Sequence, residues 1–169
     1  MNKMREIKVA KITLNIGAGK DQEVLKKGLK LLKNITGATP IQTITNKRLA
    51  AWGLRPGLPI GCKVTLRKER AVEILKNLLK AKEHRLNETQ FDDNGNVAFG
   101  IHEYIDIPNA KYDPEIGIMG FEICVSLERA GYRIKRRRMQ KKKVPVKHRI
   151  NKQEAIEFMK DKFNVQVGA

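Results

Sequence analysis

Cysteine and histidine are scarce in this chain of 169 residues. The two cysteines, Cys62 and Cys124, lie far apart with no C-x-x-C pair, and His84, His102 and His148 share no ligand spacing with them. These spacings exclude the usual zinc motifs, so we expect no metal site. Each cysteine lies in an apolar strand-like run, which predicts a small buried residue in a reducing compartment.

Long apolar runs are also missing. The longest run without a charged residue has 13 residues, from Asn34 to Asn46, which is too short and too polar to span a bilayer. The first eleven residues, MNKMREIKVAK, contain no apolar core of the kind that a secretory signal needs. We therefore expect a cytoplasmic protein without a membrane partner.

The glycine-rich stretch ITLNIGAGKD, residues 12 to 21, does not match a nucleotide-binding motif. The first glycine of a phosphate-binding loop would fall on Leu14, and Asp21 takes the place of the required hydroxyl. The third glycine of a dinucleotide fingerprint would fall on Gln22. The sequence therefore predicts no nucleotide cofactor, and we expect no cofactor of any kind.

Positive charge is what the sequence has in excess. Lys and Arg total 35 against 18 acids, a net charge of +17, which indicates a polyanionic partner. Twelve of these cations and no acid lie between Arg129 and Gln153, so the rest of the chain carries 17 − 12 = +5. Such a run cannot bury itself and repels itself when unbound. It predicts nucleic-acid contact, with a merely solvated basic surface as the alternative.

Hydrophobic periodicity predicts an α+β fold. Alternation predicts strands over 7–16, 41–45, 62–67, 97–107 and 118–127, whereas helical spacing predicts helices over 21–36, 69–82 and 151–163. Asn151 and Glu154 have the spacing of a capping box. Prolines and glycines exclude regular structure from 53 to 61, and residues 86–95 look turn-like. This order fits a single domain, an antiparallel or mixed sheet with helices on one face.

The outward positions of two predicted strands have similar chemistry. Each carries a cation, a hydroxyl and another polar group in turn, in the sets Lys11, Thr13, Asn15 and Lys63, Thr65, Arg67. In one sheet they would form a flat surface suited to the phosphates and 2′-hydroxyls of an RNA helix. A solvated sheet face is the alternative. Base stacking is less favoured, because no aromatic ring falls at these positions.

Three blocks of this sequence resemble the signature blocks of the family of large-subunit ribosomal protein five, which binds 5S ribosomal RNA. They are KITLNIGAG at residues 11–19, PIGCKVTLR at 59–67 and FDDNGNVAFGIHEYIDIPNAKYDPE at 91–115. They occur in the family order, and the similarity covers nearly the whole chain. The short amino terminus and the KHRINKQEAIEF stretch at 147–158 resemble the archaeal and eukaryotic branch.

The resemblance implies a mainly antiparallel five-stranded sheet backed by helices and docked on 5S RNA in the central protuberance. Residues 1–169 would form one domain, with the basic segment 133–149 as an extension before a C-terminal helix. Together with the residue patterns it predicts these RNA-binding residues: Lys11, Thr13, Asn15, Thr43, Lys47, Lys63, Thr65, Arg67, Arg136, Arg137, Arg138, Lys141, Lys142 and Lys143. Gly17 and Gly19 would permit a tight strand-to-helix turn close to RNA backbone.

Further partners are implied by the same resemblance. One loop resembles the family loop that approaches the elbow of the P-site tRNA, and it consists of Trp52, Gly53, Leu54, Arg55, Pro56, Gly57, Leu58, Pro59 and Ile60. Packing of the Trp52 ring in the core is an alternative for that side chain. The region 101–118 resembles the part that meets a small-subunit head protein in an intersubunit bridge. Large-subunit ribosomal RNA and neighbouring ribosomal proteins are further expected partners, and no homo-oligomer is expected.

Two other classes of function are alternatives to this reading. An enzyme is not favoured, since the candidate acid and base His102 and Glu103 are adjacent and point to opposite faces of a strand. A general RNA chaperone, driven only by the basic segment, is the stronger alternative. It would bind RNA without regard to shape.

Overall fold

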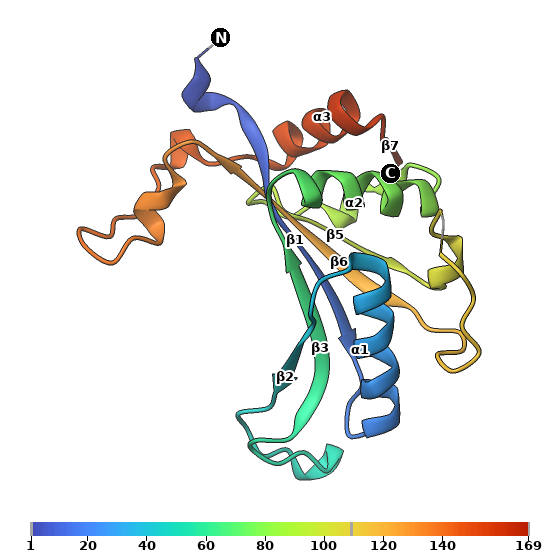
Figure 1. Ribbon diagram of the computed structural model, residues 1–169. Coiled ribbons are helices and arrows are strands. Elements are labelled where there is room, and N and C mark those ends of the chain that lie inside the picture. Colours follow the sequence, from blue (N-terminus) through green and yellow to red (C-terminus); the bar gives the residue numbers. More distant parts are fainter. Residues whose placement is uncertain (1, 109, 169) are drawn as a thin grey trace. The chain divides into compact units, whose positions relative to one another are not determined.

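The computed structural model describes residues 2–108 and 110–168. Five strands form an antiparallel sheet in the order β2-β3-β1-β6-β5, and a separate parallel pair joins β4 to β7. The strands are β1 (Ile7–Gly17), β2 (Ile41–Ile44), β3 (Pro59–Leu66), β4 (Arg85–Asn87), β5 (Val97–Ile101), β6 (Phe121–Arg129) and β7 (Gln166–Gly168), and the helices are α1 (Gln22–Thr36), α2 (Lys68–Ala81) and α3 (Lys152–Phe163). The predicted α+β class and the five-stranded sheet are confirmed (Figure 1).

The contacts of the chain cluster in two compact units. The first unit comprises residues 1–12, 67–99 and 124–169, and the second comprises 13–66 and 100–123. Strands β1, β5 and β6 each run from one unit into the other. Helices α2 and α3 and the basic segment belong to the first unit, whereas α1, β2 and β3 belong to the second.

In the second unit, α1 packs along β3 (Figure 1). The Asp21 carboxylate accepts hydrogen bonds from the N–H groups of Glu23 and Val24, which caps the helix, and Gly37 ends it at a φ of 60°. A Cβ added to Gly28 would lie 3.0 Å from the Cys62 sulfur. Helix and strands therefore approach closely on this face, and α1 does not cover the opposite face of these strands.

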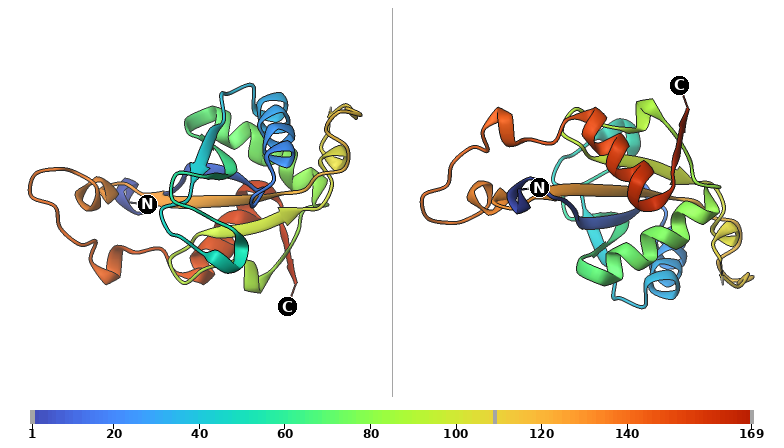
Figure 2. Two further views of the ribbon diagram at one scale, coloured as in Figure 1. Left: turned by 90° about the horizontal axis from the view of Figure 1, so that it is seen from below. Right: turned by 90° about the horizontal axis from the view of Figure 1, so that it is seen from above.

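In the first unit, α2 and α3 are connected through the short β4–β7 pair. The Gln166 N–H donates to the His84 carbonyl at 2.7 Å, and the His84 ring lies 3.1 Å from the Phe163 carbonyl oxygen. The predicted capping box of Asn151 and Glu154 is confirmed at the start of α3. Figure 2 shows the basic segment projecting from the end of β6 as a long loop that returns to α3.

Several predicted boundaries are wrong. The strand expected over 97–107 ends at Ile101 and is followed by a 3₁₀ turn, and the strand expected over 118–127 begins at Phe121. Pro59 already starts β3, because strand pairing overrides the local preference of proline and glycine for loops. Within the turn-like stretch 86–95, Leu86 is fully buried in β4.

The two cysteines differ in exposure. Cys62 is buried as predicted, but the prediction for Cys124 is wrong, because Cys124 is exposed. On β6 the core residues are Ile123 and Val125, so position 124 points to the opposite face. Burial also raises the pKa of the Cys62 thiol to about 11.

We expect a thiol reagent at pH 8 to modify Cys124 quickly in the folded protein and to leave Cys62 unmodified. Cys62 is shielded, and with a raised pKa it carries almost no thiolate at that pH. Counting modified thiols by mass spectrometry, with Cys124→Ser as the control, tests this. Rapid modification of the control variant under native conditions would contradict the burial of Cys62.

Candidate nucleic-acid interface

The face of β1 and β3 opposite α1 is polar in the second unit. Ile12, Leu14 and Ile16 are buried, whereas Thr13 and Asn15 between them are half-buried. On β3, Lys63 and Thr65 are exposed between buried Cys62, Val64 and Leu66. The predicted alternation is confirmed, and these outward side chains define the polar sheet face: Thr13, Asn15, Thr43, Lys63 and Thr65.

Strand β2 contributes Thr43 to this polar sheet face. In the antiparallel register Ile41 lies opposite Lys63 and Thr43 opposite Gly61, so both side chains share the face of Lys63. A Cβ on Gly61 would lie 3.0 Å from the Thr43 hydroxyl oxygen and 2.5 Å from the Ile16 carbonyl oxygen. Glycine is required there. Sequence reasoning missed Ile41, which adds an apolar side chain that is 66% exposed.

An acidic residue also lies on this face. The Asn15 amide donates to the Glu122 carboxylate at 3.5 Å, and Glu122 is exposed on β6. Sequence reasoning missed this contact, because the two residues are 107 positions apart. The bond uses one N–H of Asn15 and leaves its carbonyl oxygen and its second N–H for a partner.

Three predicted RNA-binding residues are not among the side chains that define the polar sheet face. Arg67 is exposed but follows the end of β3, where it is the N-cap residue of α2. Lys47 is exposed in the loop after β2, and its carbonyl accepts a hydrogen bond from the Thr45 hydroxyl at 3.1 Å. Lys11 points to the same side of β1 as Thr13 and Asn15, but it belongs to the first unit and lines a pocket there.

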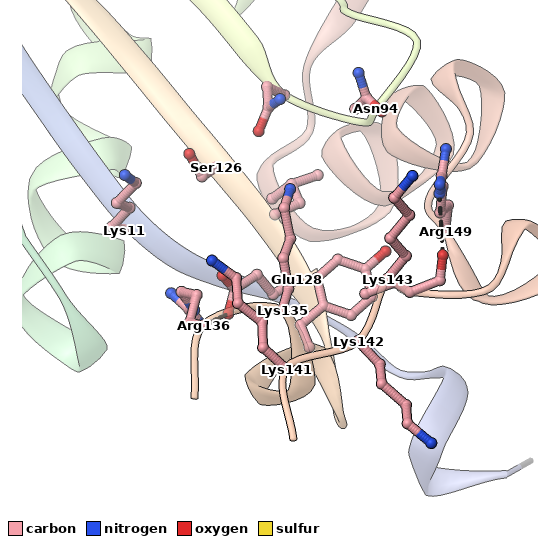
Figure 3. Close-up of a pocket in the computed structure, with 14 residues that line it drawn as sticks. Lys11, Asn94, Ser126, Glu128, Lys135, Arg136, Lys141, Lys142, Lys143 and Arg149 are labelled. Atoms are coloured by element: carbon pink, nitrogen blue, oxygen red, sulfur yellow. Dashed lines mark hydrogen bonds and ion pairs between the residues drawn. The ribbon is translucent and has the colours of Figure 1, made fainter. Parts of the chain in front are cut away.

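We call this pocket the basic pocket. It has a volume of about 540 Å³ and lies entirely in the first unit. Figure 3 shows Lys11, Ser126 and Glu128 on the strands and the labelled lysines and arginines of the basic segment around them, with the Lys142 ammonium pointing away. Its lining residues are Lys11, Asn94, Asn96, Ser126, Leu127, Glu128, Tyr132, Lys135, Arg136, Lys141, Lys142, Lys143, Val144 and Arg149.

The pocket separates the predicted basic residues into two groups. Arg136 and the three lysines 141–143 line it, whereas Arg137 and Arg138 do not. Arg137 donates from Nε to the Gln140 carbonyl at 2.9 Å, which shapes the turn between them. Sequence reasoning missed the neutral groups of the lining, above all Ser126 and the amides of Asn94 and Asn96, because no local pattern relates them to the basic segment.

One buried arginine anchors the ends of the basic segment. Arg129 is only 8% exposed and donates to the Arg5 carbonyl, the Arg149 carbonyl and the Glu154 carboxylate, at 3.1, 3.1 and 2.7 Å. From the sequence, Arg129 was one of the twelve cations from which nucleic-acid contact was predicted. Its burial shows that it has a structural role instead, since all these acceptors come from the protein.

Further contacts hold the same segment. The Tyr132 hydroxyl donates to the His148 carbonyl at 3.2 Å and accepts from the Ile150 N–H at 3.1 Å. Val144 and Ile150 are buried. The basic side chains stay in solvent, as expected of a run that cannot bury itself, but the backbone that carries them is fixed at both ends.

The predicted tRNA-proximal loop has a defined conformation. Trp52 is 70% exposed, which excludes the alternative that its ring packs in the core, and Leu54 is buried in its place. The Gly57 N–H donates to the Thr45 carbonyl at 2.9 Å, with Gly57 at a φ of 87° that favours glycine. Trp52 and Arg55 are therefore presented to solvent on an ordered loop.

The region 101–118 is tied to α1 within the second unit. The Lys30 ammonium pairs with Asp113 at 2.7 Å and also with Glu115, and the Asp113 N–H donates to the Tyr104 hydroxyl at 2.8 Å. The hydrogen bond from Lys30 lowers the pKa of the Asp113 carboxyl. Ile118 is 71% exposed beside this tether. Position 109, in the same region, lies outside the described residues.

Within the described ranges, no helix is long and apolar enough to cross a membrane. Over the same residues, no three His, Cys, Asp or Glu side chains gather as a metal site.

Two family models match this chain. Residues 2–55 match the model "Ribosomal protein L5", and residues 59–158 match the model of the C-terminus of the same ribosomal protein family. The large ribosomal subunit protein uL5 of Nanoarchaeum equitans is 49% identical over 165 residues, which covers 97% of each chain. The corresponding protein of Sulfurisphaera tokodaii is 45% identical over 99% of this chain and 95% of its own, and that of Sulfolobus acidocaldarius is 46% identical over 98% and 93%.

These matches show that the chain is a structural, non-enzymatic protein of the large ribosomal subunit, which binds ribosomal RNA and takes part in translation. Within that class, the chain belongs to the ribosomal protein L5 family and is of the archaeal type. The predicted resemblance and the cytoplasmic location in the ribosome are thereby confirmed.

Glu154→Gln tests the anchor at Arg129. Partial burial opposes ionisation of Glu154, but hydrogen bonds from the Asn151 N–H and from Arg129 outweigh it and lower the pKa of the carboxyl. The stabilisation is therefore complete above the unfolded pKa, near 4.5, and is lost as pH falls through the lower folded pKa.

We expect Glu154→Gln to cost about 1–3 kcal/mol of unfolding free energy at pH 7, between the values for exposed and for buried ion pairs. The difference from the original protein should shrink below pH 4. Thermal melts at pH 7 and pH 3 measure both, with Glu157→Gln on the exposed side of α3 as the control. A difference that is the same at both pH values would contradict the assigned pairing.

Proposed function

We propose that this protein binds 5S ribosomal RNA through the polar sheet face and helps to attach that RNA in the central protuberance of the large subunit. The observation that supports this most is the uncovered face of β1 and β3, where Thr13, Lys63 and Thr65 alternate with core residues. Family membership supports it as well, because the resemblance of the signature blocks carries 5S binding with it.

The chemistry of this face suits an A-form helix. Lys63 supplies a point charge for a phosphate, and the Thr13 and Thr65 hydroxyls can both donate to and accept from a 2′-hydroxyl. The Asn15 amide is oriented by Glu122, so its carbonyl oxygen is held ready as an acceptor. Specificity then comes from the shape of the RNA and from the position of its 2′-hydroxyls, and no bond is made or broken.

Two further contacts belong to the same proposal. The loop 52–60 approaches the elbow of the P-site tRNA, with Arg55 on the backbone and the exposed Trp52 ring beside it. The region 101–118 meets a small-subunit head protein, for which Ile118 and Tyr112 supply exposed apolar surface. The Lys30 tether would keep that surface in position.

A shape-insensitive RNA chaperone is the second candidate, and the concentration of cations in the basic pocket favours it. It differs from the first proposal in where selectivity resides. A chaperone would bind 5S RNA and any other structured RNA with similar affinity, and it would lose its affinity for both when residues 133–149 are removed.

The test changes the polar sheet face without touching the basic segment. We expect the double variant Asn15→Glu with Thr65→Glu to lose its preference for 5S RNA over an unrelated structured RNA, because carboxylates there repel phosphates and remove 2′-hydroxyl partners. The matched control is Asn34→Glu with Thr39→Glu, the same two exchanges at exposed positions off this face. Filter binding at several salt concentrations gives both affinities.

If the double variant keeps its 5S preference while the control also keeps it, the polar sheet face does not recognise 5S RNA. If the preference vanishes only when residues 133–149 are deleted, the chaperone is the better description. Thermal melts of each variant establish that the comparison is made between folded proteins.

The loop contact is tested in assembled ribosomes. We expect Arg55→Glu to speed dissociation of P-site tRNA, because an exposed carboxylate at the loop repels the tRNA backbone. Lys26→Glu on the exposed side of α1 is the matched control. Equal dissociation rates for both variants would remove tRNA from the partners of this loop.

A further inference from the structure

The basic pocket concentrates positive charge beyond what the polar sheet face needs. Seven cationic side chains and one carboxylate line it, and that carboxylate, Glu128, already pairs with Arg136 at 2.7 Å. Within the described residues the lysines of the lining have no acidic partner: Lys11, Lys135, Lys141, Lys142 and Lys143. Their mutual repulsion is unrelieved in the free protein.

Anchoring of the backbone keeps these charges together. The Arg129 hydrogen bonds and the Tyr132 hydroxyl fix the ends of the segment, and the Lys142 N–H donates to the Ile134 carbonyl at 3.1 Å across its middle. A free basic tail would relax by spreading out. The held arrangement is instead preorganised for an anion, which lowers the entropic cost of binding one.

The pocket also has neutral hydrogen-bonding groups. The side-chain amides of Asn94 and Asn96 both donate to the Asp92 carboxylate, at 3.4 and 3.0 Å, which fixes them and leaves each carbonyl oxygen as an acceptor. Ser126 adds a hydroxyl from β6, and Leu127 and Val144 add apolar surface. Phosphate alone needs none of these groups, whereas a ribose and a base use all of them.

We propose that the basic pocket binds an unpaired ribonucleotide of an RNA strand, with its flanking phosphates on the lysines and its sugar and base on the strand side. A volume of about 540 Å³ lies in the range of nucleotide-sized ligands. A double helix keeps its bases paired and stacked, so it cannot place a single sugar and base in a pocket of this volume. The residues of this site are not those of the polar sheet face, and the proposal does not depend on 5S recognition.

The lysines act as point charges and do not by themselves distinguish phosphate from carboxylate, so the hydroxyl, amide and apolar groups of the strand side favour a nucleotide over a peptide carboxylate. The arginine fork, which matches either anion, is already used: Arg136 is paired with Glu128, and Arg149 donates from Nε to the Val144 carbonyl at 3.3 Å. An acidic peptide is therefore the less favoured occupant.

The experiment measures binding of a fluorescent uridylate hexamer to the full chain by anisotropy. Competitors are a blunt RNA duplex with the same number of phosphates, uridine monophosphate and a hexaglutamate peptide. The charge variant is Lys135→Gln, Lys141→Gln and Lys143→Gln; Lys142 is left in place because its ammonium points away from the other labelled groups in Figure 3. The matched control, Lys80→Gln, Lys147→Gln and Lys160→Gln, removes three exposed lysines elsewhere in the first unit.

A second variant keeps the charge and fills the pocket. Ser126→Leu places a branched side chain at the strand side of the pocket. Its control is Cys124→Leu, a similar change two residues away on the same face of β6 but outside the pocket lining. We expect the charge variant and Ser126→Leu each to weaken hexamer binding about tenfold or more, and both controls to change it less than about twofold. The salt dependence should fall by about 0.7 for each phosphate that the charge variant no longer neutralises.

Four results would overturn the proposal. Equal losses in the charge variant and its control would mean that a diffuse field binds the RNA, and unchanged binding in Ser126→Leu would mean that the pocket is not entered. If the duplex or hexaglutamate competes as strongly as unlabelled hexamer does, the site binds another class of polyanion. Uridine monophosphate binding as tightly as the hexamer would make it a free-nucleotide site. The 5S preference, measured in parallel, should survive in both pocket variants, which separates this test from that of the polar sheet face.

Discussion

The buried guanidinium of Arg129 determines how the basic segment is arranged. A charge that is taken out of water is tolerated only where acceptors surround it, and here they come from Arg5, Arg149 and Glu154. These three residues lie in the short 3₁₀ turn before β1, at the end of the basic segment and in the first turn of α3. One side chain thus closes a loop of about twenty residues that local preferences would leave open.

Strand alternation supplies the second constraint. A period of two places Ile12, Leu14 and Ile16 in the core and leaves Thr13 and Asn15 to a partner, so the same strand builds the hydrophobic interior and the polar sheet face. The sheet needs no pocket to bind a helix of RNA. This arrangement suits a protein whose task is to hold RNA in place, in keeping with its membership of a ribosomal protein family.

The two surfaces differ in chemistry. The polar sheet face has hydroxyls, one amide and few charges, with Glu122 among them, and such a surface suits the proposed recognition of RNA shape. The basic pocket has many charges, so the RNA affinity proposed for it would depend on salt. Because the stretch from Arg129 to Gln153 holds twelve cations and no acid, most of the net charge of +17 lies in one segment.

Local sequence was enough to predict what depends on neighbours along the chain: the three helices, the capping box at the start of α3, the alternation in β1 and β3, the excess of positive charge and the family. Four features became visible only in the folded chain: the role of Arg129, the exposure of Cys124 and Trp52, the Asn15–Glu122 contact, and the meeting of Lys11, Asn94 and Ser126 with the basic segment. Periodicity and capping are local, so they can be read from a few consecutive residues. Which distant side chains meet depends on strand order and on the closure of loops, and no spacing in the sequence encodes either.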